Sequence, residues 1–283
     1  MKVPIDIWIG QAEENWLGAL YNYARELYQT TYLPSHDHKH HYRVWNISKQ
    51  LLREIATLNS SLTQARVEGV LIAALFHDLG MAQSTREDHG SLGRELCVSW
   101  FSESGRTPPS GFEQILEAIE MHDLKEARFY SGAESSPGIL NILSVADDLE
   151  AMGVIGIYRY AEIYLLRGIA MEDLGTRILE NAEHRILNLT SSAFCPGIIA
   201  QYTKQFDELT FFYQQYKRQV LGVEQAEMVW EGQLGVINYI RSQVITQNIR
   251  PEDLSRKSVE EGKETMIKEF FSKLKNELEK NRE

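Results

Sequence analysis

The sequence has little cysteine and fewer basic than acidic residues. Its two cysteines, Cys97 and Cys195, form no CxxC pair, which disfavours a disulfide framework or a cysteine-ligated zinc site and fits a reducing compartment. The 29 lysine and arginine residues are outnumbered by 40 acidic residues, so the formal net charge is −11. That balance argues against a nucleic-acid-binding surface as the main function, and we expect no nucleic-acid partner.

Long apolar runs are also missing. Uncharged apolar stretches such as VLIAALF (70–76) are far shorter than the roughly 20 residues that a transmembrane helix needs. The N-terminal stretch carries Asp6 inside its apolar part and acidic residues soon after, which does not fit a signal peptide. We therefore expect a cytoplasmic protein that is not associated with a membrane.

Hydrophobic residues recur at three- and four-residue spacing along nearly the whole chain, as amphipathic helices require. The segment 63–80 begins amphipathic and becomes apolar all round, which predicts a helix at the centre of a bundle, with Gly80 as its C-terminal cap. Strand-like alternation is scarce, so the fold class is all-α. Further helices are expected at 89–103, 111–122, 137–152, 154–168, 171–188, 196–221 and 224–248, with loops at 102–111 and 130–138.

The C-terminal residues 257–283 are dense in charge but keep one apolar stripe. The stripe consists of Met266, Ile267, Phe270, Phe271, Leu274 and Leu278. Such a helix buries one face against its own chain or against a second subunit, which would allow a homodimer through the C-terminal helices. We expect residues 1–190 to form a helical core with an N-terminal helix, and residues 191–283 to form a helical extension packed on that core or on a second subunit.

Two acidic positions have apolar neighbours that predict burial. His77 and Asp78 end the run LIAALF, and Asp147 follows Val145 and Ala146 on a core-facing helix. Burying an imidazole or a carboxylate without a partner costs several kcal/mol. A divalent cation that binds both would remove that cost. A hydrogen-bonded core pair or a helix cap would explain His77 and Asp78 equally well.

Four of the eight histidines lie within residues 36–41. Asp37 can cap a helix that starts there, and His40 then shares the inward stripe with Val44 and Ile47. The same phase predicts that the side chains of His38 and His41 point away from the stripe, while His36 could line the mouth of a site. His40 is therefore the candidate ligand of this cluster.

The order of the candidate ligands along the chain resembles a known signature, that of the HD-domain superfamily of metal-dependent phosphohydrolases. It consists of His40, His77–Asp78 and Asp147. The stretches HDHKHHYRVW, AALFHDLG and ADDLEAMGVIGIYR resemble the first, second and last motifs of that family, over roughly residues 30–170. The resemblance implies a helical bundle with a divalent ion held by these four side chains. The ion could be manganese, iron, magnesium, zinc, cobalt or nickel.

Two further histidines allow a second ion. The pattern that adds His89 and His122 resembles superfamily members with two metals, namely the HD-GYP cyclic dinucleotide phosphodiesterases and the diiron oxygenases. Asp78 would then bridge the two ions. The interval from Asp78 to His89 is shorter than in those relatives and the GYP motif is absent, whereas the last motif looks more like that of one-metal nucleotide hydrolases. His89 as a helix cap and His122 as a surface residue are the alternatives.

The resemblance implies hydrolysis of a phosphoester or phosphoanhydride of a small, nucleotide-like substrate. We expect Asp78 and Arg43 to be the catalytic residues. A bound cation would activate water and offset the negative charge of protein and substrate. Arg43, one turn after His40, is the first candidate for a phosphate contact; a salt bridge to Asp37 or Asp148 is the alternative. A diiron oxygenase and a non-catalytic module stabilised by metal remain alternative functions.

Overall fold

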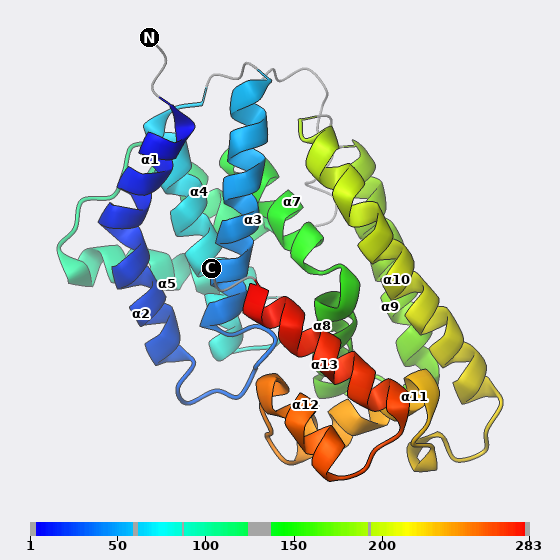
Figure 1. The fold of residues 1–283 in the computed structure, drawn as a ribbon. Coiled ribbons are helices and arrows are strands. Elements are labelled where there is room, and N and C mark those ends of the chain that lie inside the picture. The colour runs from blue at the N-terminus through cyan, green and yellow to red at the C-terminus, as the bar shows by residue number, and fades with distance from the viewer. Residues whose placement is uncertain (1–3, 59–61, 87, 124–136, 192–193, 281–283) are drawn as a thin grey trace. The chain divides into compact units, whose positions relative to one another are not determined.

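The computed structural model describes residues 4–58, 62–86, 88–123, 137–191 and 194–280. Every regular element within these ranges is helical and none is a strand, so the predicted all-α class is confirmed (Figure 1). The chain forms two compact units. The first contains residues 1–150 and 188–200, and the second contains residues 151–187 and 201–283.

The first unit contains the N-terminal helices. Their bounds are α1 Ile5–Ala12, a π-helical turn η1 Glu13–Leu17, α2 Gly18–Leu27, α3 His38–Thr57, α4 Gln64–Phe76, a 3-10 turn η2 Leu79–Ala82, α5 His89–Ser104, α6 Phe112–Met121 and α7 Ile139–Glu150.

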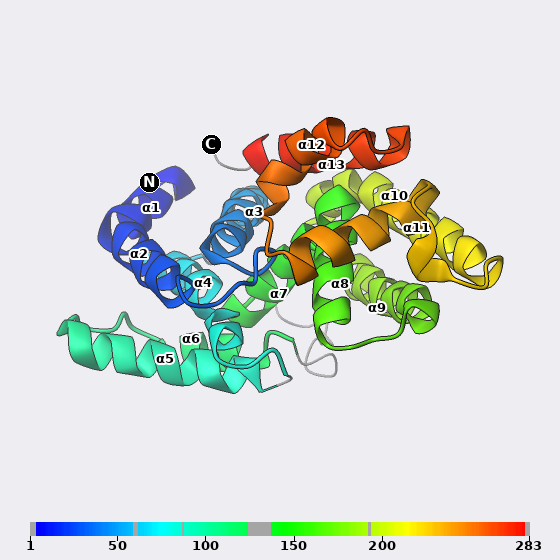
Figure 2. The same ribbon diagram turned by 90° about the horizontal axis from the view of Figure 1, so that it is seen from below.

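Helix α4 is the centre of this unit, as its apolar composition predicts. It contacts α1, α2, α3, α5, α6 and α7, and every residue from Gly69 to Phe76 is buried. Helices α3 and α7 pack against each other and against α4, while α5 and α6 lie side by side (Figure 2). Apolar side chains therefore surround α4 on all sides, and its C-terminal end at His77 lies inside the protein.

The second unit contains the remaining helices, except that residues 188–200 at the facing ends of α9 and α10 belong to the first unit. The bounds are α8 Gly153–Leu166, α9 Met171–Ser191, α10 Pro196–Leu221, a 3-10 turn η4 Ala226–Met228, α11 Gly232–Tyr239, a π-helical turn η5 Ile240–Thr246, α12 Pro251–Glu260 and α13 Thr265–Lys280.

The C-terminal helix α13 packs within the second unit. It contacts α8, α11 and α12, and five of the six predicted stripe residues, all except Met266, are buried. Helix α8 contacts both α13 and η5, which is why residues 151–187 group with the C-terminal part. The predicted division at residues 190 and 191 places them with the N-terminal part instead. Whether 1–190 and 191–283 fold as separate domains, and whether a homodimer forms, stays a prediction.

Two local predictions are wrong. The helix expected at 224–248 begins only at Gly232, whose φ of 62° is the left-handed conformation that a helix interior does not allow. Gly80 does not cap α4, because α4 ends at Phe76 and Gly80 lies within η2. Most of the loop expected at 130–138 lies outside the described residues. Within the described ranges, none of the helices combines the length and the apolar character needed to cross a membrane.

Candidate metal centre

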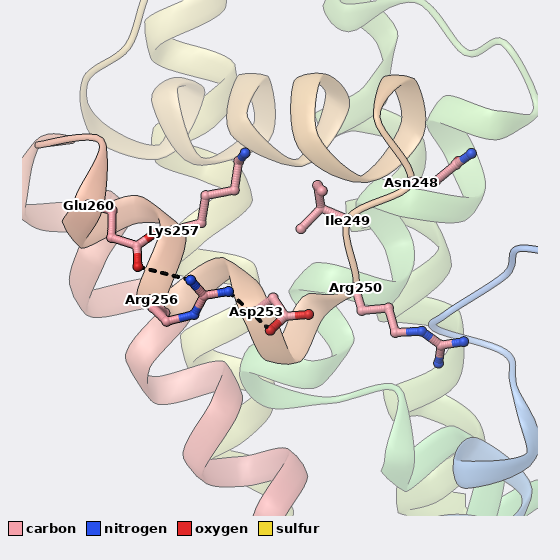
Figure 3. Close-up of a pocket in the computed structure, with 7 residues that line it drawn as sticks. All are labelled: Asn248, Ile249, Arg250, Asp253, Arg256, Lys257 and Glu260. Atoms are coloured by element: carbon pink, nitrogen blue, oxygen red, sulfur yellow. Dashed lines mark hydrogen bonds and ion pairs between the residues drawn. The ribbon is translucent and has the colours of Figure 1, made fainter.

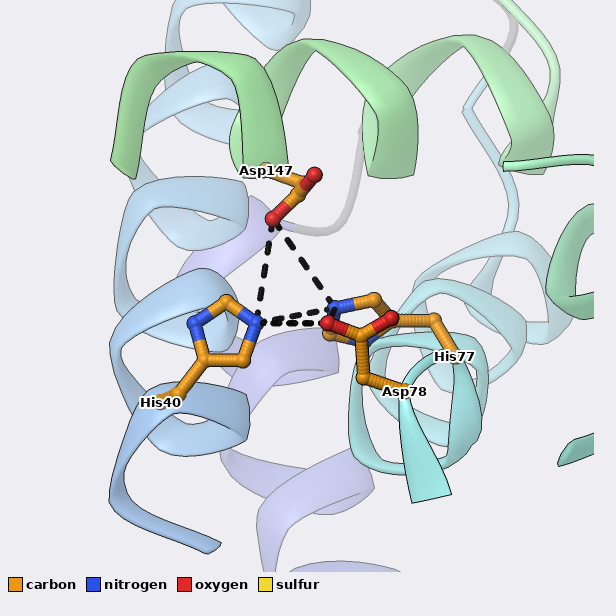
Figure 4. Close-up of side chains that lie close together, drawn as sticks. All are labelled: His40, His77, Asp78 and Asp147. Carbon is orange, nitrogen blue, oxygen red and sulfur yellow. Dashed lines mark hydrogen bonds and ion pairs between the residues drawn. The ribbon is translucent and has the colours of Figure 1, made fainter. Parts of the chain in front are cut away.

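Four of the predicted ligands meet at the ends of three helices of the first unit. His40 lies in the first turn of α3, which begins there because the Asp37 carboxylate accepts hydrogen bonds from the backbone N–H of Lys39 and His40. His77 and Asp78 follow the last residue of α4, and Asp147 projects from α7 toward them (Figure 4). All four side chains are buried.

The distances between their donor atoms fit one small cation. Nε2 of His40 lies 3.1 Å from Nε2 of His77, 3.3 Å from Oδ2 of Asp78 and 3.7 Å from Oδ1 of Asp147. Nε2 of His77 lies 3.5 Å and 4.0 Å from the same two oxygens. Ligand atoms about 2.1 Å from a single ion are separated by about 3.0 Å in an octahedron and about 3.4 Å in a tetrahedron. The four atoms therefore need only small shifts to bind one ion.

Three histidine rings are oriented by their own chain. Nδ1 of His77, His89 and His122 lies 2.9, 2.8 and 2.7 Å from the backbone carbonyl oxygen three residues earlier. A carbonyl oxygen only accepts, so Nδ1 carries the proton. In a neutral ring, Nε2 then presents its lone pair to the interior, which is the form that binds a metal.

Asp78 faces two groups of histidines with its two oxygens. Oδ2 lies toward His40 and His77, whereas Oδ1 lies 3.1 Å from Nε2 of His122 and 3.4 Å from Nε2 of His89. Asp78, His89 and His122 thus form a second group of buried donor atoms that could hold an ion. A carboxylate shared in this way is the arrangement expected of a bridge between two cations.

Tight packing of α5 brings His89 to this second group. A Cβ atom on Gly80 would lie 2.0 Å from the carbonyl oxygen of His89, and one on Gly90 would lie 2.5 Å from the carbonyl oxygen of Glu120. Only glycine allows these approaches of η2 to α5 and of α5 to α6. The two glycines therefore help to set the distance between Asp78 and the second pair of histidines.

Burial and mutual charge shift the pKa values of the cluster. Burial raises the pKa of Asp78, but the positive charge of His77 and hydrogen bonds from His122 and His40 outweigh it and hold that pKa well below its usual value. Burial lowers the pKa of His77. For His122, burial is outweighed by the hydrogen bond and the charge of Asp78, which raise its pKa to about 8. Asp78 is thus ionised at neutral pH, as a ligand must be.

The charge of the interior also favours a cation. Asp78, Asp147 and Glu150 are all buried, and the buried Arg43 pairs with Glu150. Buried carboxylates are stable when they are paired or when they coordinate a metal. A divalent ion at the first group of ligands would add positive charge beside Asp78 and Asp147.

His41 contradicts the predicted helical phase. Its side chain is fully buried rather than directed away from the core, and Nδ1 lies 3.2 Å from the Ala74 carbonyl oxygen, which also accepts from His77. Burial lowers the pKa of His41 well below its usual value. The prediction failed because the His41 ring packs against the rings of Tyr28 and His77, 5.9 and 4.9 Å away between centroids. The buried face of α3 is therefore wider than one stripe at this position. His38 is partly exposed, and His36 is buried with its ring 5.6 Å from that of His40.

Arg43 is buried, and its Nε donates a hydrogen bond of 2.6 Å to Oε1 of Glu150. The sequence predicted Asp37 or Asp148 as the salt-bridge partner of Arg43, and the partner is Glu150 instead. The spacing could have indicated it, because Glu150 lies three residues after Asp147 and therefore on the same face of α7. The predicted contact of Arg43 with a substrate phosphate, and the role of the six predicted residues as ligands, stay predictions.

Two surface pockets lie outside the buried cluster. One, of about 310 Å³, lies beside α12, and its Arg256 is paired with Glu260 at 2.9 Å and with Asp253 at 3.7 Å (Figure 3). The other, of about 570 Å³, lies at the starts of α4, α6 and α7 and contains Arg66 and Glu117. Neither contains a histidine or the buried carboxylates, so the cluster around Asp78 is the stronger candidate for chemistry.

Comparison with known proteins places this cluster in a family. Residues 38–152 match the family model described as HD domain, and this segment begins just before His40 and ends just after Glu150. That part of the chain is therefore an HD domain, as its motifs predict. No curated protein and no solved structure matches the chain. The family is one of metal-dependent phosphohydrolases, and the buried histidines and aspartates of this chain could hold the metal.

Proposed function

We propose that this protein is a metal-dependent phosphohydrolase that cleaves a phosphoester or phosphoanhydride of a small, nucleotide-like substrate. The observation that carries the proposal is the position of Asp78, whose two oxygens face two separate groups of histidines. A buried carboxylate between such groups is suited to bind one divalent ion through each oxygen. Asp78 would thus hold two ions together, which would supply the chemistry of a two-metal hydrolase.

A bound divalent ion would supply the chemistry by lowering the pKa of a coordinated water and neutralising phosphate oxygens. The first ion would be held by Asp78 together with His40, His77 and Asp147. The second ion would be held by Asp78 together with His89 and His122. The Nδ1 hydrogen bonds of His77, His89 and His122 keep their rings in place during turnover. With a formal charge of −11, the chain depends on these ions to attract an anionic substrate.

The substrate class rests on the resemblance of the motifs and on the HD-domain match. If Arg43 contacts a substrate phosphate as proposed, it would do so through its terminal guanidinium nitrogens, because its Nε already donates to Glu150. We further propose a cytoplasmic protein without a nucleic-acid or membrane partner, in keeping with the negative net charge.

The deciding experiment is elemental analysis of protein purified without added metal, together with hydrolysis of a panel of nucleotides and phosphodiesters. We expect two equivalents of metal in the parent. His122→Ala should retain one equivalent and lose most of the hydrolysis, whereas the control His184→Ala, at an exposed histidine of α9, should change neither. Unchanged metal content in His122→Ala would establish the one-metal arrangement.

The ligand set also fits a dinuclear iron site, because imidazole and carboxylate ligands both suit iron. A diiron oxygenase is therefore the second candidate function. The oxygenase would be the better assignment if the protein contains two equivalents of iron, consumes oxygen and hydrolyses no compound of the panel. Bound metal with neither activity would favour a non-catalytic, metal-stabilised module.

A further inference from the structure

A row of three buried side chains connects α3 to α7 beside the metal centre. Nε of Arg43 donates to Oε1 of Glu150 at 2.6 Å, and Oε2 of Glu150 lies 3.2 Å from Nδ1 of His40. His40 and Arg43 are three residues apart on α3, as are Asp147 and Glu150 on α7. The two helices therefore face each other with one ligand and one further charged residue each.

His40 differs from the other histidines of the centre in how its ring is held. The carbonyl oxygen three residues before His40 belongs to Asp37, and it accepts the backbone N–H of His40 at 2.9 Å to start the helix. Nδ1 of His40 faces a carboxylate oxygen instead of that carbonyl, in an ion-pair contact of 3.2 Å. This contact lacks the hydrogen-bond geometry of the Nδ1 bonds in the other three histidines, but it puts Glu150 at the ring nitrogen that a backbone carbonyl engages there.

We propose that Glu150 is a positioning residue: its Oε2, 3.2 Å from Nδ1 of His40, accepts the Nδ1 proton when a cation is bound, and so presents Nε2 as the metal-binding atom. In the same arrangement, Arg43 holds the Glu150 side chain in place. A carboxylate in this position fixes the tautomer of a ligating imidazole and makes it a stronger donor. The inference rests on the proposed function only in that Nε2 of His40 binds a cation.

The geometry explains why Arg43 belongs to the arrangement. Its guanidinium donates to Oε1 of Glu150 at 2.6 Å, and both side chains are buried. The planar donors of a guanidinium restrict the rotamer of the carboxylate that they bind. Oε2 of Glu150 is thereby held facing Nδ1 of His40.

The test measures Zn²⁺ affinity of the metal-free chain by competition with a chromogenic chelator. We expect Glu150→Ala to bind the first ion about 10- to 100-fold more weakly, the usual effect of removing a partner of a ligating histidine. Glu150→Gln keeps the shape and an acceptor oxygen but not the charge, so its loss should be intermediate. Arg43→Ala should weaken binding in the parent and have a smaller effect when Glu150 is already alanine.

Matched controls come from an exposed pair that joins α3 to α1. Arg53 of α3 donates to Asp6 of α1 at 2.9 Å on the protein surface, so Arg53→Ala and Asp6→Asn remove an arginine–carboxylate pair outside the centre. Neither should change Zn²⁺ affinity. Nitrogen-15 chemical shifts of the His40 ring give a second readout, because they should report a proton on Nδ1 in the parent and a mixture of tautomers in Glu150→Ala.

The inference would be overturned if Glu150→Ala binds Zn²⁺ as tightly as the parent does. If that variant does not fold, Glu150→Gln takes its place in the test. A change in KM for substrate alone in Arg43→Ala would also overturn it, since that result assigns Arg43 to a phosphate contact. A parent that binds metal but hydrolyses nothing contradicts the proposed function alone. The affinities of the Glu150 variants still decide the positioning role in that case.

Discussion

Gly80→Ala should remove the second metal ion and leave the first. The new methyl group would start 2.0 Å from the carbonyl oxygen of His89, whereas an ordinary contact between such atoms is about 3.5 Å. The segment that carries His89 must therefore move away from η2 by about 1.5 Å. Metal–ligand distances tolerate only about 0.2 Å, so His89 would no longer reach an ion shared with Asp78.

His40 and Asp147 come from α3 and α7, and the Nε2 of His77 faces them rather than α5. Helix α5 contacts the end of α4, so the prediction is that its shift is taken up at His89 and leaves the first group in place. We expect one equivalent of metal in Gly80→Ala against two in the parent, with an overpacking cost of about 1–3 kcal/mol in the free energy of unfolding. Elemental analysis and urea unfolding measure the two quantities, and circular dichroism verifies the fold. Gly10→Ala is the control, because a Cβ there has no atom within 4 Å and the substitution favours the helix.

If Gly80→Ala holds two equivalents and unfolds like the parent, the close approach of η2 to α5 does not position His89. A loss of both ions would show instead that the two groups of ligands are not independent.

Three further predictions concern other residues of the centre. Asp78→Ala should lose both ions and all hydrolysis, because each group of ligands contains one of its oxygens; elemental analysis that finds a full equivalent would contradict this. Affinity for the second ion should rise as the pH increases toward about 8 and then level off, since His122, with its pKa raised to about 8, must lose its proton to bind. Chelator competition between pH 6 and 9 measures this rise, which should be absent in His122→Ala. His41→Ala should lower the stability of the metal-free protein by about 2–4 kcal/mol, as large-to-small core substitutions do, and urea unfolding with a change below about 0.5 kcal/mol would show a surface-like position.

The sequence predicted most of the centre because burial of charge leaves a local trace. His77, Asp78 and Asp147 follow apolar runs, and the helical phase assigned His40 correctly to the interior. Each of these inferences needs only the residues within a few turns of one helix. The domain match to residues 38–152 agrees with the motifs that they form.

The remaining features depend on contacts between distant segments. The burial of His41 follows from its contacts with Tyr28 and with Ala74 of α4, which the periodicity of α3 does not report. The contact between Arg43 and Glu150 joins α3 to α7, and the pattern of each helix alone left the partner of Arg43 open. Gly80 looked like a cap because a glycine after a helix commonly is one, whereas its contact with the backbone of His89 appears only once α5 is packed.

Three ligand rings are held by local hydrogen bonds, from Nδ1 of His77, His89 and His122 to carbonyl oxygens three residues earlier. These bonds bear on the order in which the protein assembles. Each bond joins two atoms only three residues apart, so it can form as soon as that short segment adopts its local conformation. The cost in side-chain entropy of fixing each ring, which is of the order of 1 kcal/mol, is then met during folding rather than when an ion arrives. Binding of the second ion should consequently need little rearrangement of these rings, and its rate should be limited by access from solvent and by loss of water from the ion.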